Sequence, residues 1–147
     1  KVLIIGTGAL EKNLKEIVDK MGLNDTVIFT GFINNVNEVL SILDVQANAS
    51  FGTEATSLSL LEGMSMGIPA VVSNYGGNPG VISHGENGYI FKLKDSNDMA
   101  GYIMKLMDEP ETYKYMQKRS AEIFNEKFTA EIYARNIEAV YAELMKK

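Results

Sequence analysis

The sequence predicts an α/β fold: a doubly wound, mostly parallel sheet with helices on both faces, followed by a helical C-terminus. Two observations support this prediction. Short apolar runs rich in β-branched residues alternate with segments whose apolar residues recur at helical spacing. Glycine, proline and asparagine punctuate these segments, so the connections are short. Strands that alternate with helices on short connections form parallel sheets that are covered on both faces.

The N-terminal part contains two strand-helix units. Val2 to Ile5 is an apolar run that ends at the glycine turn of residues 6–8, and a helical pattern follows over 10–21. Gly22 is placed to end that helix. A second apolar run at 27–29 precedes a helical pattern over 36–43.

The middle of the chain repeats the alternation. It predicts a strand at 45–49, a helix at 58–66, a strand at 70–72 and, after the Asn87-Gly88 turn, a strand at 89–91. Everything beyond Asp95 reads as helical. One helix runs to Met107, a second runs from the break at Pro110 to about residue 125, and a third is capped by Thr129.

The composition predicts one soluble domain over residues 1–147, because 147 residues of which 46% are hydrophobic suffice for a single core. No apolar run is long enough to span a membrane, and no signal peptide is visible, so we expect a cytoplasmic protein. A net charge of −5 argues against nucleic-acid or anionic-membrane partners. With no cysteine and a single histidine, His84, a metal centre is not expected.

Two carboxylates, Glu54 and Glu62, flank the start of the helix predicted at 58–66. Glu54 falls in the loop beyond a strand, and Glu62 falls one to two turns deeper, so they could touch two parts of one ligand. The free N–H groups at this helix N-terminus, near Thr56 to Leu58, form a natural site for a diphosphate. Ligands of doubly wound sheets bind beyond the carboxyl ends of the strands.

The block from Glu54 to Pro69, followed by Val71-Val72-Ser73 and Gly76-Gly77, resembles the signature of the family-4 (group 1) retaining glycosyltransferases. The resemblance extends to the glycine turn after Val2 to Ile5, to the Val27–Phe32 segment and to the late turn at Glu86-Asn87-Gly88. These enzymes have the GT-B fold, two Rossmann-like domains facing a cleft. This chain is similar to the C-terminal domain, which holds the nucleotide-sugar donor.

The resemblance also implies roles for individual residues. Glu54 would be the catalytic residue and would contact the donor sugar, while Glu62 would bind the ribose and Phe32 and Ile33 the base. The sugar and diphosphate would lie against Gly6, Thr7, Gly8, Ala55, Thr56, Ser57 and Leu58. The donor would be a UDP-, GDP- or ADP-sugar that serves as substrate, and neither a cofactor nor a metal is implied.

The sequence departs from the family pattern in three places. Glu54-Ala-Thr-Ser replaces the usual Glu-Gly-Phe-Gly, and Asn78-Pro79-Gly80 stands where a Glu usually follows the proline, which we interpret as drift. No Lys or Arg occurs from Met21 to Phe91, although this stretch holds six acidic residues. In the family, the phosphate-binding cations come from a first strand and its loop, upstream of this sequence.

We therefore expect a truncated domain that lacks the family's first strand, with a gap between two groups of strands where that strand would lie. We also expect a missing N-terminal acceptor domain, through which any peripheral membrane association would occur, and an inactive isolated chain.

Three other interpretations remain open. The chain could be a non-enzymatic Rossmann-like interaction module, in which the carboxylates only support helix ends and Ser59 and Glu62 form a capping box. It could be a GT-B type nucleotide-sugar epimerase domain, although such enzymes need functional histidines. It could be an NAD-type dehydrogenase, because Gly6-x-Gly8 after a strand is similar to a dinucleotide-binding fingerprint. That fingerprint is weak here, because Glu11 stands in place of its third glycine.

Overall fold

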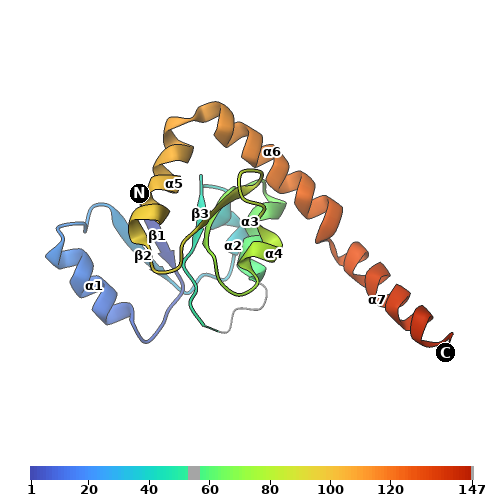
Figure 1. The fold of residues 1–147 in the computed structure, drawn as a ribbon. Helices are drawn as coiled ribbons and strands as arrows, with labels where there is room; N and C mark the ends of the chain where they lie inside the picture. Colours follow the sequence, from blue (N-terminus) through green and yellow to red (C-terminus); the bar gives the residue numbers. More distant parts are fainter. Residues whose placement is uncertain (53–56, 147) are drawn as a thin grey trace. The chain divides into compact units, whose positions relative to one another are not determined.

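The structure, a computed structural model, describes residues 1–52 and 57–146 and divides into two compact units, Lys1–Val39 and Leu40–Lys147. Figure 1 shows the order of the elements along the chain. The first unit contains β1 (Val2–Ile5), α1 (Glu11–Lys20), β2 (Val27–Gly31) and α2 (Val36–Leu40), whose last residue belongs to the second unit. The second unit contains β3 (Gln46–Asn48), α3 (Leu58–Ser65), β4 (Ala70–Ser73), α4 (Asn78–Val81), β5 (Gly88–Phe91), α5 (Ser96–Asp108), α6 (Pro110–Lys127) and α7 (Ala130–Leu144).

In the first unit, β1 and β2 form a two-stranded parallel sheet in which Val2 pairs with Val27 and Ile4 with Phe29. Beyond the end of β1, the Gly6 N–H donates to the Gly31 carbonyl at 2.9 Å. Gly6 has a φ of +104°, which an L-residue with a side chain rarely adopts. The glycine therefore lets the chain leave the strand and turn into α1.

In the second unit, β3, β4 and β5 form a parallel sheet with β4 in the centre. All four residues of β4 are buried, as expected for a central parallel strand with both faces covered. Together with β1 and β2, these strands confirm the predicted parallel α/β fold. The strands fall into two groups, as the sequence analysis expected.

Two apolar clusters cover the two faces of β4. Ala70 and Val72 pack with Leu60 and Met64 of α3 on one face, whereas Val71 packs with residues of α5, α6 and β5 on the other. This alternation follows from the two-residue period of a strand. Each fully buried Leu or Met contributes about 1.5–3 kcal/mol relative to an exposed side chain. The core thus holds α3 on one face of the sheet and α5 on the other.

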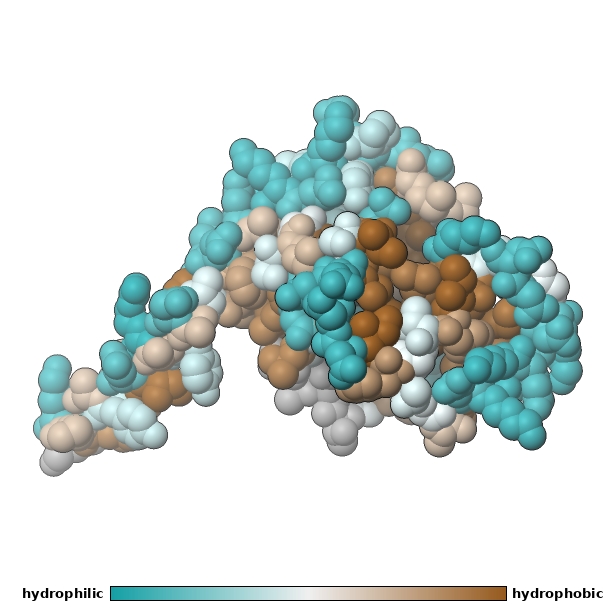
Figure 2. Space-filling view, turned by 180° about the vertical axis from the view of Figure 1, so that it is seen from behind, coloured by the Kyte–Doolittle hydropathy of each residue, from teal (hydrophilic) through white to brown (hydrophobic). Residues whose placement is uncertain are grey.

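The C-terminal helices follow the predicted boundaries closely. The Thr129 hydroxyl accepts a hydrogen bond from the Ile132 N–H at 3.4 Å, which confirms Thr129 as the N-cap of α7. α7 has no buried residue, and its apolar side chains lie on the surface beside polar ones (Figure 2). Within residues 1–52 and 57–146, none of the helices combines the length and apolar character needed to cross a bilayer.

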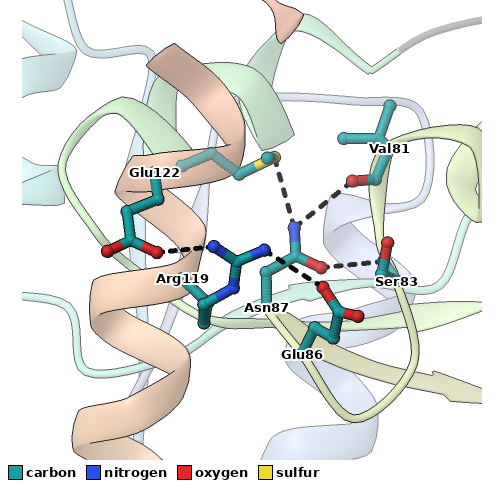
Figure 3. A network of polar contacts seen from close by, with 7 residues as sticks. Val81, Ser83, Glu86, Asn87, Arg119 and Glu122 are labelled. Atoms are coloured by element: carbon teal, nitrogen blue, oxygen red, sulfur yellow. Dashed lines mark hydrogen bonds and ion pairs between the residues drawn. The ribbon is translucent and has the colours of Figure 1, made fainter. Parts of the chain in front are cut away.

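The turn before β5 is held by a buried amide. Asn87 accepts a hydrogen bond from the Ser83 N–H at 2.7 Å and donates to the Val81 carbonyl at 3.3 Å and to the Met64 sulfur at 3.8 Å (Figure 3). Beside it in this view, Arg119 pairs with Glu122 at 2.5 Å and with Glu86 at 3.3 Å.

The Arg119 hydrogen bond lowers the pKa of the Glu122 carboxyl. Arg119 and Glu122 are half-buried, and Glu86 is exposed. The fully buried Asn87 amide, which bonds to the backbone on both sides of the turn, therefore contributes most to fixing it.

We predict that Asn87→Ala destabilises the second unit by about 2–3 kcal/mol, because it leaves the half-buried Ser83 N–H and the carbonyl of the buried Val81 without these partners. Chemical denaturation monitored by tyrosine fluorescence would measure this loss, since all seven tyrosines lie beyond residue 39. The matched control is Asn125→Ala on the exposed side of α6, which should change stability by less than about 0.5 kcal/mol. Equal stabilities for the two variants would contradict the prediction.

Candidate functional site

The first unit brings two of the predicted binding segments to one edge of its sheet. Gly6, Thr7 and Gly8 follow the carboxyl end of β1, and Phe32 and Ile33 follow the carboxyl end of β2. Because β1 and β2 are parallel, these ends meet at the same edge, where the hydrogen bond between Gly6 and Gly31 joins them. Phe32 is 75% exposed, so its ring is free to contact a planar group such as a base.

A shallow hollow beside this edge contains cations that the sequence analysis did not consider. It runs from Gly8 along the exposed side of α1, and its lining includes Lys12 and Lys15 together with Glu11, Glu16 and Asp19. Lys15 pairs with Glu11 at 2.6 Å and lies over the Phe29 ring. Among the described residues, Lys12 makes no ion pair. The position of Lys12 one turn after the glycine turn is the sequence signal that could have identified it.

The second unit places the start of α3 at the carboxyl edge of its own sheet. Ser57 is the N-cap residue, and α3 begins at Leu58, so the N–H groups of the first turn have no acceptor four residues earlier within the helix. Glu62 lies four residues after Leu58 and therefore on the same face. Leu58 is 72% exposed and Glu62 is exposed, whereas Leu60, Gly63 and Met64 face the core.

The remaining predicted residues of this region, Glu54, Ala55 and Thr56, lie outside the described residues. The structure therefore brings Ser57, Leu58 and Glu62 together at one helix start and says nothing of those three. Among residues 1–52 and 57–146, no group of three or more acidic or histidine side chains is arranged to hold a metal ion.

A close contact between α3 and β3 fixes the position of the helix. The Gln46 side-chain amide donates to the Ser59 carbonyl at 2.6 Å, and its oxygen lies where a side chain on Gly63 would have to be. A side chain at residue 63, directly after Glu62, would require the Gln46 side chain to move away from α3. The presentation of Glu62 thus depends on the packing of α3 against β3.

Hydrogen bonds from neighbouring strands hold the chain on both sides of residues 51–56. On one side, the Ser73 hydroxyl donates to the Ser50 carbonyl at 2.9 Å, and Asn48 accepts from the Ser50 N–H at 2.9 Å. On the other side, the Asn48 side-chain amide donates to the Ser57 hydroxyl at 3.2 Å. Asn48 and Ser73 therefore hold the two described residues Ser50 and Ser57 in place.

Asn78 supports the position of Ser73. Its buried side chain donates to both the carbonyl and the hydroxyl of Ser73 at 3.2 Å. Asn78 also begins α4, which has a proline in its first turn and which the sequence analysis did not predict. Asn78 is thus a structural residue of the site.

The capping-box interpretation of Ser59 and Glu62 is wrong. The helix begins one residue before Ser59, its N-cap is Ser57, and that side chain makes no capping hydrogen bond. The Ser59 hydroxyl instead lies 2.9 Å from the Ser57 hydroxyl. Glu62 is therefore not used to cap α3.

Comparison with known proteins identifies the family. A family model described as glycosyl transferases group 1 matches residues 1–123. The N-acetyl-alpha-D-glucosaminyl L-malate synthase of Bacillus anthracis is 30% identical over 146 residues, which are 99% of this chain and 38% of the synthase. The chain thus spans well under half the length of this relative.

One solved structure supports the same assignment, and a second shares the fold. The C-terminal domain of LpcC, a group 1 glycosyl transferase of Francisella tularensis, has a TM-score of 0.73 and 27% identity, covering 82% of this chain and 63% of that one. Anabaena HepE in complex with UDP-glucose has a TM-score of 0.86 and 22% identity, over 95% of this chain and 40% of HepE. The latter likeness shows the Rossmann-like fold of GT-B enzymes. The chain belongs to the group 1 family of glycosyl transferases.

Proposed function

We propose that this chain is the donor-binding half of a retaining glycosyltransferase and that it holds a UDP-, GDP- or ADP-sugar. The observation that carries the proposal is the start of α3, where the first N–H groups of the helix and the exposed Glu62 stand one turn apart beyond the carboxyl end of β3. An anion fits the helix start, and a carboxylate accepts hydrogen bonds from a vicinal diol. HepE, which shares the fold, is complexed with UDP-glucose.

We assign the donor's parts to the residues named in the sequence analysis. Glu62 accepts hydrogen bonds from the ribose hydroxyls, and Phe32 and Ile33 border the base. The diphosphate and sugar lie against two sets of residues, Gly6 to Gly8 and Ala55 to Leu58. Glu54 contacts the hydroxyls of the transferred sugar and is the proposed catalytic residue.

The chemistry that we propose for this site is charge stabilisation. A retaining transfer passes through an oxocarbenium-like state while a nucleoside diphosphate leaves, and fixed dipoles and hydrogen-bond donors stabilise the separated charges. No metal and no acid-base pair is part of this proposal.

We further propose that the chain works as part of a longer, cytoplasmic enzyme. The Bacillus anthracis relative extends well beyond the matched region, and the strands of this chain fall into two separate groups. A further strand between those groups would complete one doubly wound sheet and supply the phosphate-binding cations. A second domain would bind the acceptor and make any membrane contact.

The test is an assay of the full-length protein that contains this chain. We expect one of the UDP-, GDP- or ADP-sugars to release its nucleoside diphosphate in the presence of acceptor, with retention of the anomeric configuration. The isolated chain should give no turnover. Inversion of the configuration would contradict the retaining mechanism, and normal transfer by Glu54→Ala would favour the interaction-module alternative. Isomerisation of the donor sugar without any acceptor would favour the epimerase.

A further inference from the structure

Three loops of the second unit place one side chain each at the same edge of the sheet. Phe51 follows β3, Tyr75 follows β4 and Lys94 follows β5, and these strands are parallel neighbours. The rings of Phe51 and Tyr75 lie 5.7 Å apart between centroids at an angle of 47°. The Lys94 ammonium lies 4.2 Å from the centre of the Phe51 ring. We call these three residues the carboxyl-edge cluster.

The cluster is open to solvent. Phe51 is 64% exposed, Lys94 is exposed and Tyr75 is half-buried. Exposed aromatic faces of this kind suit the C–H face of a sugar ring, which is apolar and flat. The cluster therefore has the surface that a carbohydrate would contact.

Lys94 has a strained backbone. Its φ of +64° makes it the one non-glycine residue with a positive φ within residues 1–52 and 57–146. It occupies the third position of a tight turn that is closed by a hydrogen bond from the Asp95 N–H to the Lys92 carbonyl at 2.9 Å. Glycine would fit this position without strain. Strain that is kept where a simpler residue would remove it indicates a functional side chain.

The charge of Lys94 is available to a ligand. The nearby carboxylates face the start of α5 instead: Asp95 accepts from the Asp98 N–H at 3.0 Å, and Asp98 accepts from the Lys92 N–H at 2.7 Å. Among the described residues, Lys94 makes no ion pair. An ammonium above a ring still has N–H bonds that point away from it, and these can donate to an anion.

We propose that the carboxyl-edge cluster binds a sugar that carries an anionic group, either a phosphate or a carboxylate. The rings of Phe51 and Tyr75 contact the sugar, and Lys94 pairs with the anion. If the chain is the donor-binding half of a glycosyltransferase, this sugar is the acceptor. The acceptor role rests on the proposed function, whereas the binding site does not.

The experiment is a nuclear magnetic resonance titration of the chain with glucose 6-phosphate, glucuronate, glucose and inorganic phosphate. We expect glucose 6-phosphate or glucuronate to shift the ring signals of Phe51 and Tyr75 and the Lys94 amide. Of these two, the better ligand identifies the anion. The protein should bind it roughly tenfold more tightly than it binds glucose or phosphate, because one additional charge-assisted contact contributes about that factor. Equal affinities for glucose and both anionic sugars, or shifts only at other residues, would overturn the proposal.

The Lys94→Gly variant should change stability and sugar affinity in opposite directions. Removing the strain should raise the melting temperature by about 2–4 °C, while the loss of the ammonium lowers the affinity for the anionic sugar roughly tenfold. Phe51→Leu should weaken the binding of glucose and of the anionic sugar alike. Lys114→Ala on α6 is the control and should change neither quantity. An unchanged affinity in Lys94→Gly would overturn the proposal.

Three further measurements distinguish this site from the donor site. Glu62→Ala should keep its affinity for glucose 6-phosphate or glucuronate, whichever binds. In a second outcome, no nucleotide sugar binds the chain while the anionic sugar still shifts the ring signals of Phe51 and Tyr75. That result would contradict the proposed function and would still support the carboxyl-edge cluster as a binding site for an anionic sugar. Displacement of the anionic sugar by UDP-glucose would assign the cluster to the donor and overturn its role as an acceptor site.

Discussion

Gly88→Ala is expected to unfold the second unit or to destabilise it by roughly 3 kcal/mol or more. Gly88 opens β5 and pairs with Ala70 of the buried strand β4. A methyl group on Gly88 would overlap the Ala70 carbonyl oxygen and lie 2.9 Å from the Ala70 carbonyl carbon. Both partners are main-chain atoms of a central strand, so no flexible side chain can move aside. β5 would have to separate from β4, which also removes Tyr89 and Phe91 from the core.

Urea unfolding monitored by tyrosine fluorescence measures this effect in the second unit alone. The matched control is Gly101→Ala on the exposed side of α5, where an added methyl group meets no atom within 4 Å. Because alanine favours a helix more than glycine does, the control should be stabilised by about 0.5–1 kcal/mol. A Gly88→Ala variant as stable as the control would show that β4 and β5 are not packed as described.

Glu62→Ala is expected to weaken nucleotide-sugar binding by roughly 100-fold without loss of stability. Two hydrogen bonds from ribose hydroxyls to one carboxylate contribute about 3 kcal/mol together, which corresponds to that factor. Stability should not fall, because Glu62 is exposed and alanine is a good helix former. Calorimetric titration of the full-length protein measures the affinity.

A donor that lacks one ribose hydroxyl makes this prediction more specific. The wild type should bind a 2′-deoxyribose analogue of the UDP-sugar more weakly than the parent donor, and Glu62→Ala should bind both equally. Glu138→Ala on the exposed side of α7 removes the same charge elsewhere and should bind like the wild type. Continued discrimination between the two donors by Glu62→Ala would assign the ribose to another residue.

Much of the fold was predictable because it depends on local patterns. The periodicity of apolar residues located all five strands of the described residues, and Thr129 and Gly22 marked helix ends where the structure has them. Gly22 has a φ of +67°, the left-handed conformation that commonly follows a helix. By contrast, α4 was missed, because Asn78-Pro79-Gly80 has the composition of a turn and the helix is only four residues long.

The candidate site was predictable only in part. Ser57, Leu58 and Glu62 lie at a helix start as expected, since a helix start and its exposed face follow from sequence spacing. The anchoring of Ser50 by Ser73 and the approach of Lys94 to Phe51 join loops that are distant in the sequence. Contacts of this kind depend on which strands become neighbours, and no local pattern encodes them.

The most direct test of the donor-binding proposal is a nuclear magnetic resonance titration of the isotope-labelled chain with UDP-, GDP- and ADP-sugars. We predict that one of them shifts the signals of Ser57, Leu58, Glu62 and Gly6 to Gly8, with an affinity weaker than micromolar because the chain has no cation between Met21 and Phe91. Shifts that avoid these residues, or the absence of any shift with all three donors, would contradict the proposal.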